Sequence, residues 1–279
     1  MRRLWCAFGL AALVASVPAA GDMQLQGVGA DHACSCRHDR FYAGADRDFL
    51  FEAMDFSGVG RAAGGAWATM ISPSYFVSAN HFHPAAGEAV TFCAGNGLAA
   101  PAHTLTVAGG MRIGGSDLWL GWFAEPAPAA VAHYPILWLD DERAYLGQEI
   151  VVYGKPDRVG LNHVDDIRDR SGSRALIFGF DAAGGAGESE AYLMVGDSGG
   201  PSFVAVGGAL ALVGVHSFHS SAAPSDGAQS GDCFLPFYVG PIGEVMIGEQ
   251  ADLFTPVPEP TASAVWCFAI LTSLARRRR

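Results

Sequence analysis

The sequence has little positive charge and almost no lysine. Its 279 residues include 17 basic and 28 acidic side chains, and Lys155 is the single lysine. Six of the basic residues lie near the two ends, so residues 22–260 carry 11 basic against 28 acidic side chains, a net charge of −17. A surface this acidic repels phosphate backbones. The composition therefore argues against nucleic acid as a partner and excludes lysine-based chemistry away from position 155.

Several motifs are also missing. No His-Glu-x-x-His helix and no glycine-rich phosphate loop followed by Lys-Ser/Thr is present. Outside the two ends, no run of 12 or more residues has a helical period of apolar side chains. These absences exclude the common zinc hydrolase and nucleotide-binding frameworks, and they argue against a helical bundle.

Short apolar stretches separated by Gly, Pro, Asn or Asp make up most of the chain. Half of the residues are hydrophobic, 16% are charged and 36 are glycine, which excludes disorder and suits many turns. The stretches are rich in Val, Ile, Phe, Tyr and Trp, as strands of sandwiches and barrels are. The predicted strands are 67–71, 75–78, 89–93, 105–108, 118–122, 150–153, 175–180, 201–206, 210–216 and 234–239. We therefore predict an all-β body whose strands close on themselves and hide their edges.

The two ends have the pattern of targeting segments. Residues 1–20 combine a basic start, an apolar stretch and small residues, which predicts a secretory signal peptide cut after Ala19 or Ala20. The alternative is a buried N-terminal helix. Near the other end, Pro-Glu-Pro at 258–260 precedes an apolar run at 262–275 and four arginines. This run is short for a membrane span, which needs about 17–25 residues.

The three-part C-terminal segment resembles the PEP-CTERM sorting signal of Gram-negative bacteria. That resemblance implies recognition by an exosortase-type machinery, transient membrane anchoring, and a destination at the cell surface or in the extracellular matrix. The expected organisation is a signal peptide at 1–20, an N-terminal arm at 21–48, a catalytic domain at 49–250, and a linker with the sorting signal at 251–279.

Four cysteines remain between the two targeting segments: Cys34, Cys36, Cys93 and Cys233. In an oxidising compartment they allow two disulfides in three connectivities.

A metal site is the alternative, because Cys34, Cys36 and His38 place three ligands within five residues. His81 with His83, and His216 with His219, also have ligand-like spacing, but no carboxylate completes a zinc framework around them.

The most specific motif is Gly-Asp-Ser-Gly-Gly-Pro at residues 196–201. Glycines on both sides of Ser198 let backbone approach a substrate closely. The N–H groups of Gly196 and Ser198 can point at one spot and stabilise an oxyanion there. A tight turn between strands is the alternative, and it leaves the Asp-Ser pair unexplained.

A serine nucleophile needs a base, and the base needs an acid to orient it. His81 follows the apolar stretch 75–80 and so stands at the end of a predicted strand. Asp117 begins the predicted strand 118–122 and lies between His81 and Ser198 in the chain. Asp140 and Asp141 are the alternative acids, although they fall in a predicted loop.

These segments resemble the chymotrypsin/trypsin-like serine proteases over about residues 49–249. The order His81, Asp117, Ser198 is the order of that family. The resemblance implies two six-stranded antiparallel β-barrels with the active site in the cleft between them. It also implies Ser198 as nucleophile, His81 as general base and then acid, Asp117 as orienting acid, and Gly196 and Ser198 as the oxyanion hole, with no cofactor.

The resemblance also implies a substrate-binding wall, which consists of Tyr192, His216, Ser217 and His219. Tyr192 stands where trypsin has an acid, so we expect no preference for Lys or Arg before the cut. His216 and His219 suggest a preference for an acidic side chain there, although either can equally be a hydrogen-bonded wall residue.

Two departures from the family accompany these expectations. Phe82 follows the histidine where the family has a cysteine, and no Ile-Val-Gly-Gly-like start is present to pair with Asp197. The predicted function is a secreted serine endopeptidase acting on proteins or peptides. A catalytically silent binding barrel and a serine esterase with the same triad are the alternatives.

Overall fold

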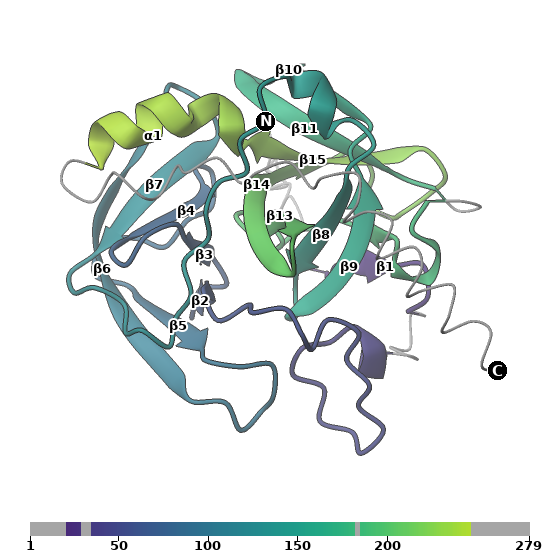
Figure 1. Ribbon diagram of the computed structural model, residues 1–279, viewed down its shortest axis with the longest axis horizontal. Coiled ribbons are helices and arrows are strands. Elements are labelled where there is room, and N and C mark those ends of the chain that lie inside the picture. Colours follow the sequence, from purple (N-terminus) through teal and green to yellow (C-terminus); the bar gives the residue numbers. More distant parts are fainter. Residues whose placement is uncertain (1–20, 29–34, 182–184, 247–279) are drawn as a thin grey trace, which may run out of the picture.

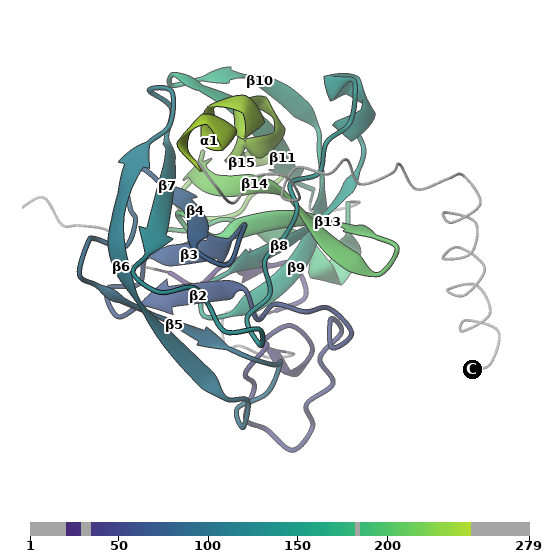
Figure 2. The same ribbon diagram turned by 60° about the vertical axis from the view of Figure 1, so that its left-hand side comes forward.

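The computed structural model describes residues 21–28, 35–181 and 185–246. The predicted signal peptide and sorting signal lie outside the described residues. Within them, no helix is both long and apolar enough to cross a membrane. Two β-units fill almost the whole described part, and they lie side by side in Figures 1 and 2.

The first unit is a closed six-stranded antiparallel barrel. Its apolar interior includes Phe76, Phe92 and Phe123, and the ring of Phe123 contacts the rings of the other two. Glycines allow close strand pairing, since a Cβ at Gly121 would meet the Phe76 ring at 2.2 Å. In spatial order its strands are β2 (Val59–Ala62), β3 (Trp67–Met70), β4 (Tyr75–Ala79), β7 (Leu118–Phe123), β6 (Ala102–Arg112) and β5 (Ala89–Cys93).

The second unit is a curled seven-stranded sheet. Its strands, in spatial order, are β10 (Asp166–Arg170), β11 (Ser173–Phe180), β15 (Ala228–Phe234), β14 (Ala209–His219), β13 (Pro201–Val206), β8 (Glu149–Gly154) and β9 (Arg158–His163). No ladder closes it. Instead the Asn162 side chain in β9 donates to the carbonyl of Gly179 in β11 at 2.8 Å.

The remaining elements are short. The arm adds a strand, β1 (Gln24–Leu25), which pairs with β12 (Ala191–Tyr192). Four 3-10 helices and one α-helix complete the described part: η1 (Ser35–Arg37), η2 (Glu142–Tyr145), η3 (Gly187–Ser189), η4 (Leu235–Tyr238) and α1 (Val239–Val245).

An apolar core joins the two units. It combines Trp67 and Leu120 of the barrel with Phe203 and Val215 of the sheet, and Ile242 of α1 contributes to the same cluster. Burial of large side chains of this kind contributes about 1.5–3 kcal/mol each. The units are therefore fixed against each other by a shared core, and the loops at their junction are held on rigid strands.

The predicted all-β architecture of two β-units is confirmed, and it is consistent with a chymotrypsin-like two-barrel fold. The second unit differs in detail, because it is an open curled sheet of seven strands rather than a closed barrel of six. Nine predicted strands coincide with observed ones to within a few residues.

The prediction of a strand over 234–239 was wrong. Phe234 ends β15, and the chain then forms η4 and α1, because Pro236 has no N–H for a ladder. The polar run before it, which has no strand-like apolar pattern, forms β15 itself. The mostly polar strand β10 and the Gly-containing β2 were likewise missed.

Candidate active site

His81 lies at the junction of the two units, just after the end of β4. The backbone there is tied to the start of β7, since the Asn80 N–H donates to the carbonyl of Asp117 at 2.8 Å. The His81 N–H also donates to Asp117 Oδ1 at 3.0 Å. Two neighbouring barrel strands thus hold the histidine and the aspartate in register.

The Asp117 carboxylate orients the imidazole. Its Oδ2 lies 2.7 Å from His81 Nδ1, so this nitrogen carries the hydrogen and donates it. The Ser217 hydroxyl of β14 donates to the same oxygen at 2.6 Å. Burial acts to raise the pKa of Asp117, but the hydrogen bonds from His81 and Ser217 outweigh burial and lower it. The acid is thus ionised at neutral pH and fixes the tautomer of the base.

Ser198 meets the histidine from the other unit. His81 Nε2 lies 2.8 Å from Ser198 Oγ, close enough for the proton transfer that activates a hydroxyl. The serine lies on the loop between β12 and β13. That loop needs glycine after the serine, because Gly199 has φ +86° and a Cβ there would lie 2.6 Å from Ser78 Oγ.

The loop also leaves two N–H groups without an internal acceptor. The N–H groups of Asp197, Gly199 and Gly200 all donate to backbone carbonyls, whereas in the described part of the chain those of Gly196 and Ser198 donate to none. The carbonyl of Gly196 is held by Trp67 Nε1 at 3.1 Å. Free N–H groups on Ser198 and on the residue two positions before it are what an oxyanion hole beside the Ser198 hydroxyl requires.

The partner of Asp197 is backbone. Its carboxyl group is fully buried and accepts from the N–H groups of Lys155 and Met194, each at 2.7 Å. None of the described arginines pairs with it. Burial raises its pKa to about 6, against the opposing effect of these hydrogen bonds.

A cavity of about 470 Å³ opens beside Ser198. Its lining includes His216, Ser217 and His219, three of the four residues expected to form the substrate-binding wall. Tyr192 does not line it, because its side chain is fully buried and its hydroxyl is bonded to the backbone of Ser221. Leu193, Met194 and Phe218 give the cavity a largely apolar wall.

His216 is fully buried and both of its ring nitrogens are bonded internally. Nδ1 lies 2.8 Å from Asp232 Oδ1, and Nε2 lies 3.1 Å from the carbonyl of Tyr153. Both partners are acceptors, so both nitrogens carry hydrogens and the ring is an imidazolium. Burial acts to lower its pKa, but Asp232 outweighs burial and raises it. This histidine has no free nitrogen for a substrate carboxylate.

His219 keeps one nitrogen free. Its Nδ1 lies 2.7 Å from the carbonyl of Ser221, which leaves Nε2 without a partner in the described residues. Asp232, which holds the neighbouring His216, was missed in the sequence. Only its pairing with His216 across β14 and β15 reveals its role, and no local motif marks that pairing.

The other candidates have different roles. Asp141 accepts from the N–H of Arg143 and caps η2, so the acid at the histidine is Asp117. The His83 ring stacks on Trp119 with centroids 3.8 Å apart.

Cys36, Cys93 and Cys233 are free thiols, and Cys34 lies outside the described residues. No group of three or more His, Cys, Asp or Glu side chains in the described ranges is placed to hold a metal ion.

No known family model matches this chain, and no curated protein matches it in sequence.

Proposed function

We propose that the protein is a serine hydrolase that cleaves peptide bonds in proteins or peptides through an acyl-enzyme. The observation that carries the proposal is the position of His81, 2.7 Å from Asp117 and 2.8 Å from Ser198. Nucleophile, base and orienting acid thus form a continuous hydrogen-bonded chain, which is the arrangement that acyl transfer by serine needs.

In the first half of the reaction, Ser198 Oγ attacks the carbonyl carbon and His81 Nε2 takes its proton. The carbonyl oxygen becomes an oxyanion and accepts hydrogen bonds from the N–H groups of Gly196 and Ser198. His81 then gives the proton to the leaving amine, the C–N bond breaks, and an ester to Ser198 remains. Asp117 stabilises the imidazolium that exists between these two transfers.

In the second half, water replaces the amine. His81 takes a proton from the water, whose oxygen attacks the ester carbonyl, and the same oxyanion donors act again. Return of the proton to Ser198 Oγ releases the carboxylic acid and restores the enzyme. Apart from water, the two halves of the reaction use only the side chains of Ser198, His81 and Asp117 and the two backbone N–H groups.

In this proposal the 470 Å³ cavity takes the substrate side chain before the cut. Its lining includes no acidic side chain besides the buried Asp197, which supports a preference for side chains other than Lys or Arg at that position. His219 is the one cavity histidine with a free nitrogen, so any preference for Glu or Asp before the cut depends on it. A peptide library in which neither acid is enriched at that position would remove this part of the proposal.

The proposal places the chain among the chymotrypsin/trypsin-like proteases and includes export to the cell surface or matrix. The order of His81, Asp117 and Ser198 and the fold support the family. The two end segments of the sequence support export. Fractionation of the native host with an antibody against residues 49–246 tests export. Recovery only in the cytoplasm would contradict it.

The test of activity compares peptide and ester turnover by the folded protein with turnover by Ser198→Ala. Peptide hydrolysis that is lost in the variant supports the endopeptidase. Ester hydrolysis without peptide hydrolysis would instead assign a serine esterase. The absence of both in a correctly folded, processed chain would assign a silent binding barrel and overturn the proposal.

A further inference from the structure

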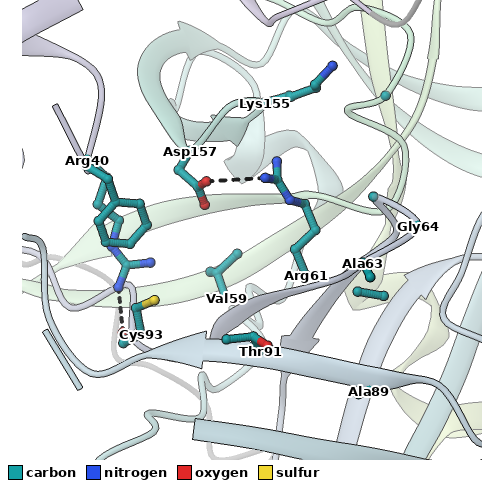
Figure 3. A pocket seen from close by; sticks show the side chains of 14 residues that line it. Arg40, Val59, Arg61, Ala63, Gly64, Ala89, Thr91, Cys93, Lys155 and Asp157 are labelled. Carbon is teal, nitrogen blue, oxygen red and sulfur yellow. Dashed lines mark hydrogen bonds and ion pairs between the residues drawn. The ribbon is translucent and has the colours of Figure 1, made fainter. Parts of the chain in front are cut away.

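A second cavity, of about 630 Å³, adjoins the cavity described above at Gly196. Figure 3 shows it between strands β2 and β5 of the barrel and the turn that follows β8. Gly196 belongs to the lining of both cavities. An extended chain whose carbonyl sits at the Gly196 N–H is therefore within reach of both cavities.

Two cations, Arg61 and Lys155, line this cavity, and neither side chain has a hydrogen-bonded partner among the described residues. The nearest carboxylate to Arg61 is Asp157, at 3.8 Å, and the nearest to Lys155 is Asp22, at 3.9 Å. Both distances exceed those of a charge-assisted hydrogen bond, which are about 2.7–2.9 Å. Both side chains are about one-third exposed. They therefore have donors left for a ligand.

The other charged groups of the cavity are already engaged. The Arg40 guanidinium is buried and donates to Asn96, Tyr153 and two backbone carbonyls. Asp157 accepts from the Tyr153 hydroxyl at 2.9 Å. With the cations Arg40, Arg61 and Lys155 against Asp157 and Asp22, the charge is positive here.

A positive cavity contrasts with the rest of the molecule. Residues 22–260 carry a net charge of −17, and the chain's one lysine lies here. Apolar side chains, among them Val59 and Ala63, form the walls between the charged groups. Apolar walls lower the local dielectric and strengthen attraction to an anion, so the cavity suits a small ligand group with one negative charge.

We propose that this cavity binds a carboxylate within the first two residues after the cut, between Arg61 and Lys155. The inference rests on the proposed function for its orientation, because the cavity lined by Ser217 and His219 takes the acyl side. The carboxylate is that of an Asp or Glu side chain, or the free C-terminus of a short leaving peptide. The protein is then selective for acidic sequences after the cut, irrespective of what precedes it.

A binding experiment tests this without turnover. Ser198→Ala, labelled with ¹⁵N-lysine, gives a single backbone amide signal, that of Lys155, because the chain has one lysine. Three peptides are titrated against it: Ala-Asp-Ala amide, Ala-Asn-Ala amide, and Ala-Ala-Ala with a free carboxylate. We expect the aspartyl peptide to bind about tenfold more tightly than the asparaginyl one, a difference that shrinks as salt is added.

Arg61→Gln is the test variant and Arg168→Gln the matched control. Arg168 is a half-exposed arginine on β10, far along the chain and absent from the cavity lining. We expect the first to remove most of the tenfold difference and the second to preserve it. Tighter binding of Ala-Ala-Ala than of the aspartyl peptide would assign the site to the free C-terminus of a leaving peptide. This is the second of the two carboxylates that the proposal allows.

Equal affinities for all three peptides, or an unchanged preference in Arg61→Gln, would overturn the inference. Either result leaves the proposed function standing, because binding is measured with the nucleophile removed. Conversely, a silent barrel can still bind the acidic peptide. In the active enzyme, kcat/KM for substrates with Asp rather than Asn after the cut should differ about tenfold, and Lys155→Gln should reduce that ratio.

Discussion

The closed barrel and the curled sheet bury different kinds of side chain. Across residues 59–123, the polar side chains buried in the barrel are hydroxyls only: Thr69, Ser72, Ser78 and Ser116. In residues 149–234, the described part of the sheet buries ionisable groups as well: Arg158, Glu190, Asp197, His216 and Asp232. Both units contribute to one site, but the barrel buries uncharged hydroxyls whereas the sheet buries ionisable groups.

The difference follows from what each unit contributes. The barrel supplies His81 and Asp117, which lie at strand ends where solvent screens their charges. The sheet supplies the loop of Ser198, whose shape depends on the buried Asp197. A buried charge is costly unless it is paired and hydrogen-bonded. The interior of the barrel is thus apolar apart from a few hydroxyls, whereas the sheet carries the cost of buried ionisable groups, one of which shapes the loop around Ser198.

The largest expected effect is the loss of activity when either His81 of the barrel or Ser198 of the sheet is replaced. We predict that His81→Ala and Ser198→Ala each lower kcat by about 10⁴–10⁶-fold, and that the double variant is no slower than the worse single one. The residues act as one chain, so their effects should not add. Steady-state kinetics on the four proteins measures this. Losses that multiply would show that the two units act independently.

The next largest effect should be on the stability of the sheet. Asp232→Ala leaves the His216 imidazolium buried without its carboxylate, and we expect a loss of about 3–5 kcal/mol in unfolding free energy. The double variant His216→Phe, Asp232→Leu should cost less than the sum of the single variants His216→Phe and Asp232→Leu. Urea unfolding of the two single variants and the double variant provides the comparison. Strictly additive losses would contradict a coupled pair.

The buried Asp197 should make stability depend on pH. Its folded pKa of about 6 lies above the unfolded value of 3.8. The folded state therefore binds the proton more tightly, and the contribution of this group falls as pH rises from about 4 to about 6. The full contribution is about 3 kcal/mol.

Asp197→Asn cannot titrate and should remove this part of the pH dependence. Urea midpoints at pH 4 and pH 6.5, both in a Ser198→Ala background to prevent self-cleavage, measure it. Identical pH dependence with and without the Asp197 carboxyl group would mean that the group is not protonated preferentially in the fold.

The smallest effect should be in the barrel. The Thr69 hydroxyl is buried and has no hydrogen-bond partner within the part of the chain that the structure describes, so Thr69→Val removes a desolvated polar group at nearly constant volume. We expect about 1 kcal/mol of stabilisation, visible as a higher urea midpoint, and unchanged kcat. Destabilisation would show that the barrel also depends on a buried polar contact.

The sequence predicted the parts of the site that depend on local pattern. Ser198 lies in a glycine-rich motif, and His81 and Asp117 each adjoin an apolar strand, so chain order and strand ends sufficed to bring the three together. The all-β class followed from the short apolar stretches, and the arrangement in two β-units followed from the resemblance to the serine proteases. The seventh strand and the open edge of the sheet did not, because β10 is polar and its place depends on pairing with β11.

Contacts between segments far apart in the chain could not be predicted from the sequence. His216 was expected to face substrate, but its partner Asp232 lies in a run of polar residues that reads as a loop. The backbone partners of Asp197 carry no sequence signal at all. Arg61 and Lys155 lie 94 positions apart and line one cavity only because β2 and the turn after β8 border it.

The central claim is that a base from the barrel activates a nucleophile from the sheet. The most direct measurement is mass spectrometry of the mature protein after a timed reaction with a serine-directed phosphonylating reagent, in parallel with His81→Ala. The account predicts one adduct, on Ser198, that forms about 10³-fold or more slowly in the variant. Equal labelling rates in the two proteins, or no adduct on the folded, processed chain, would contradict it.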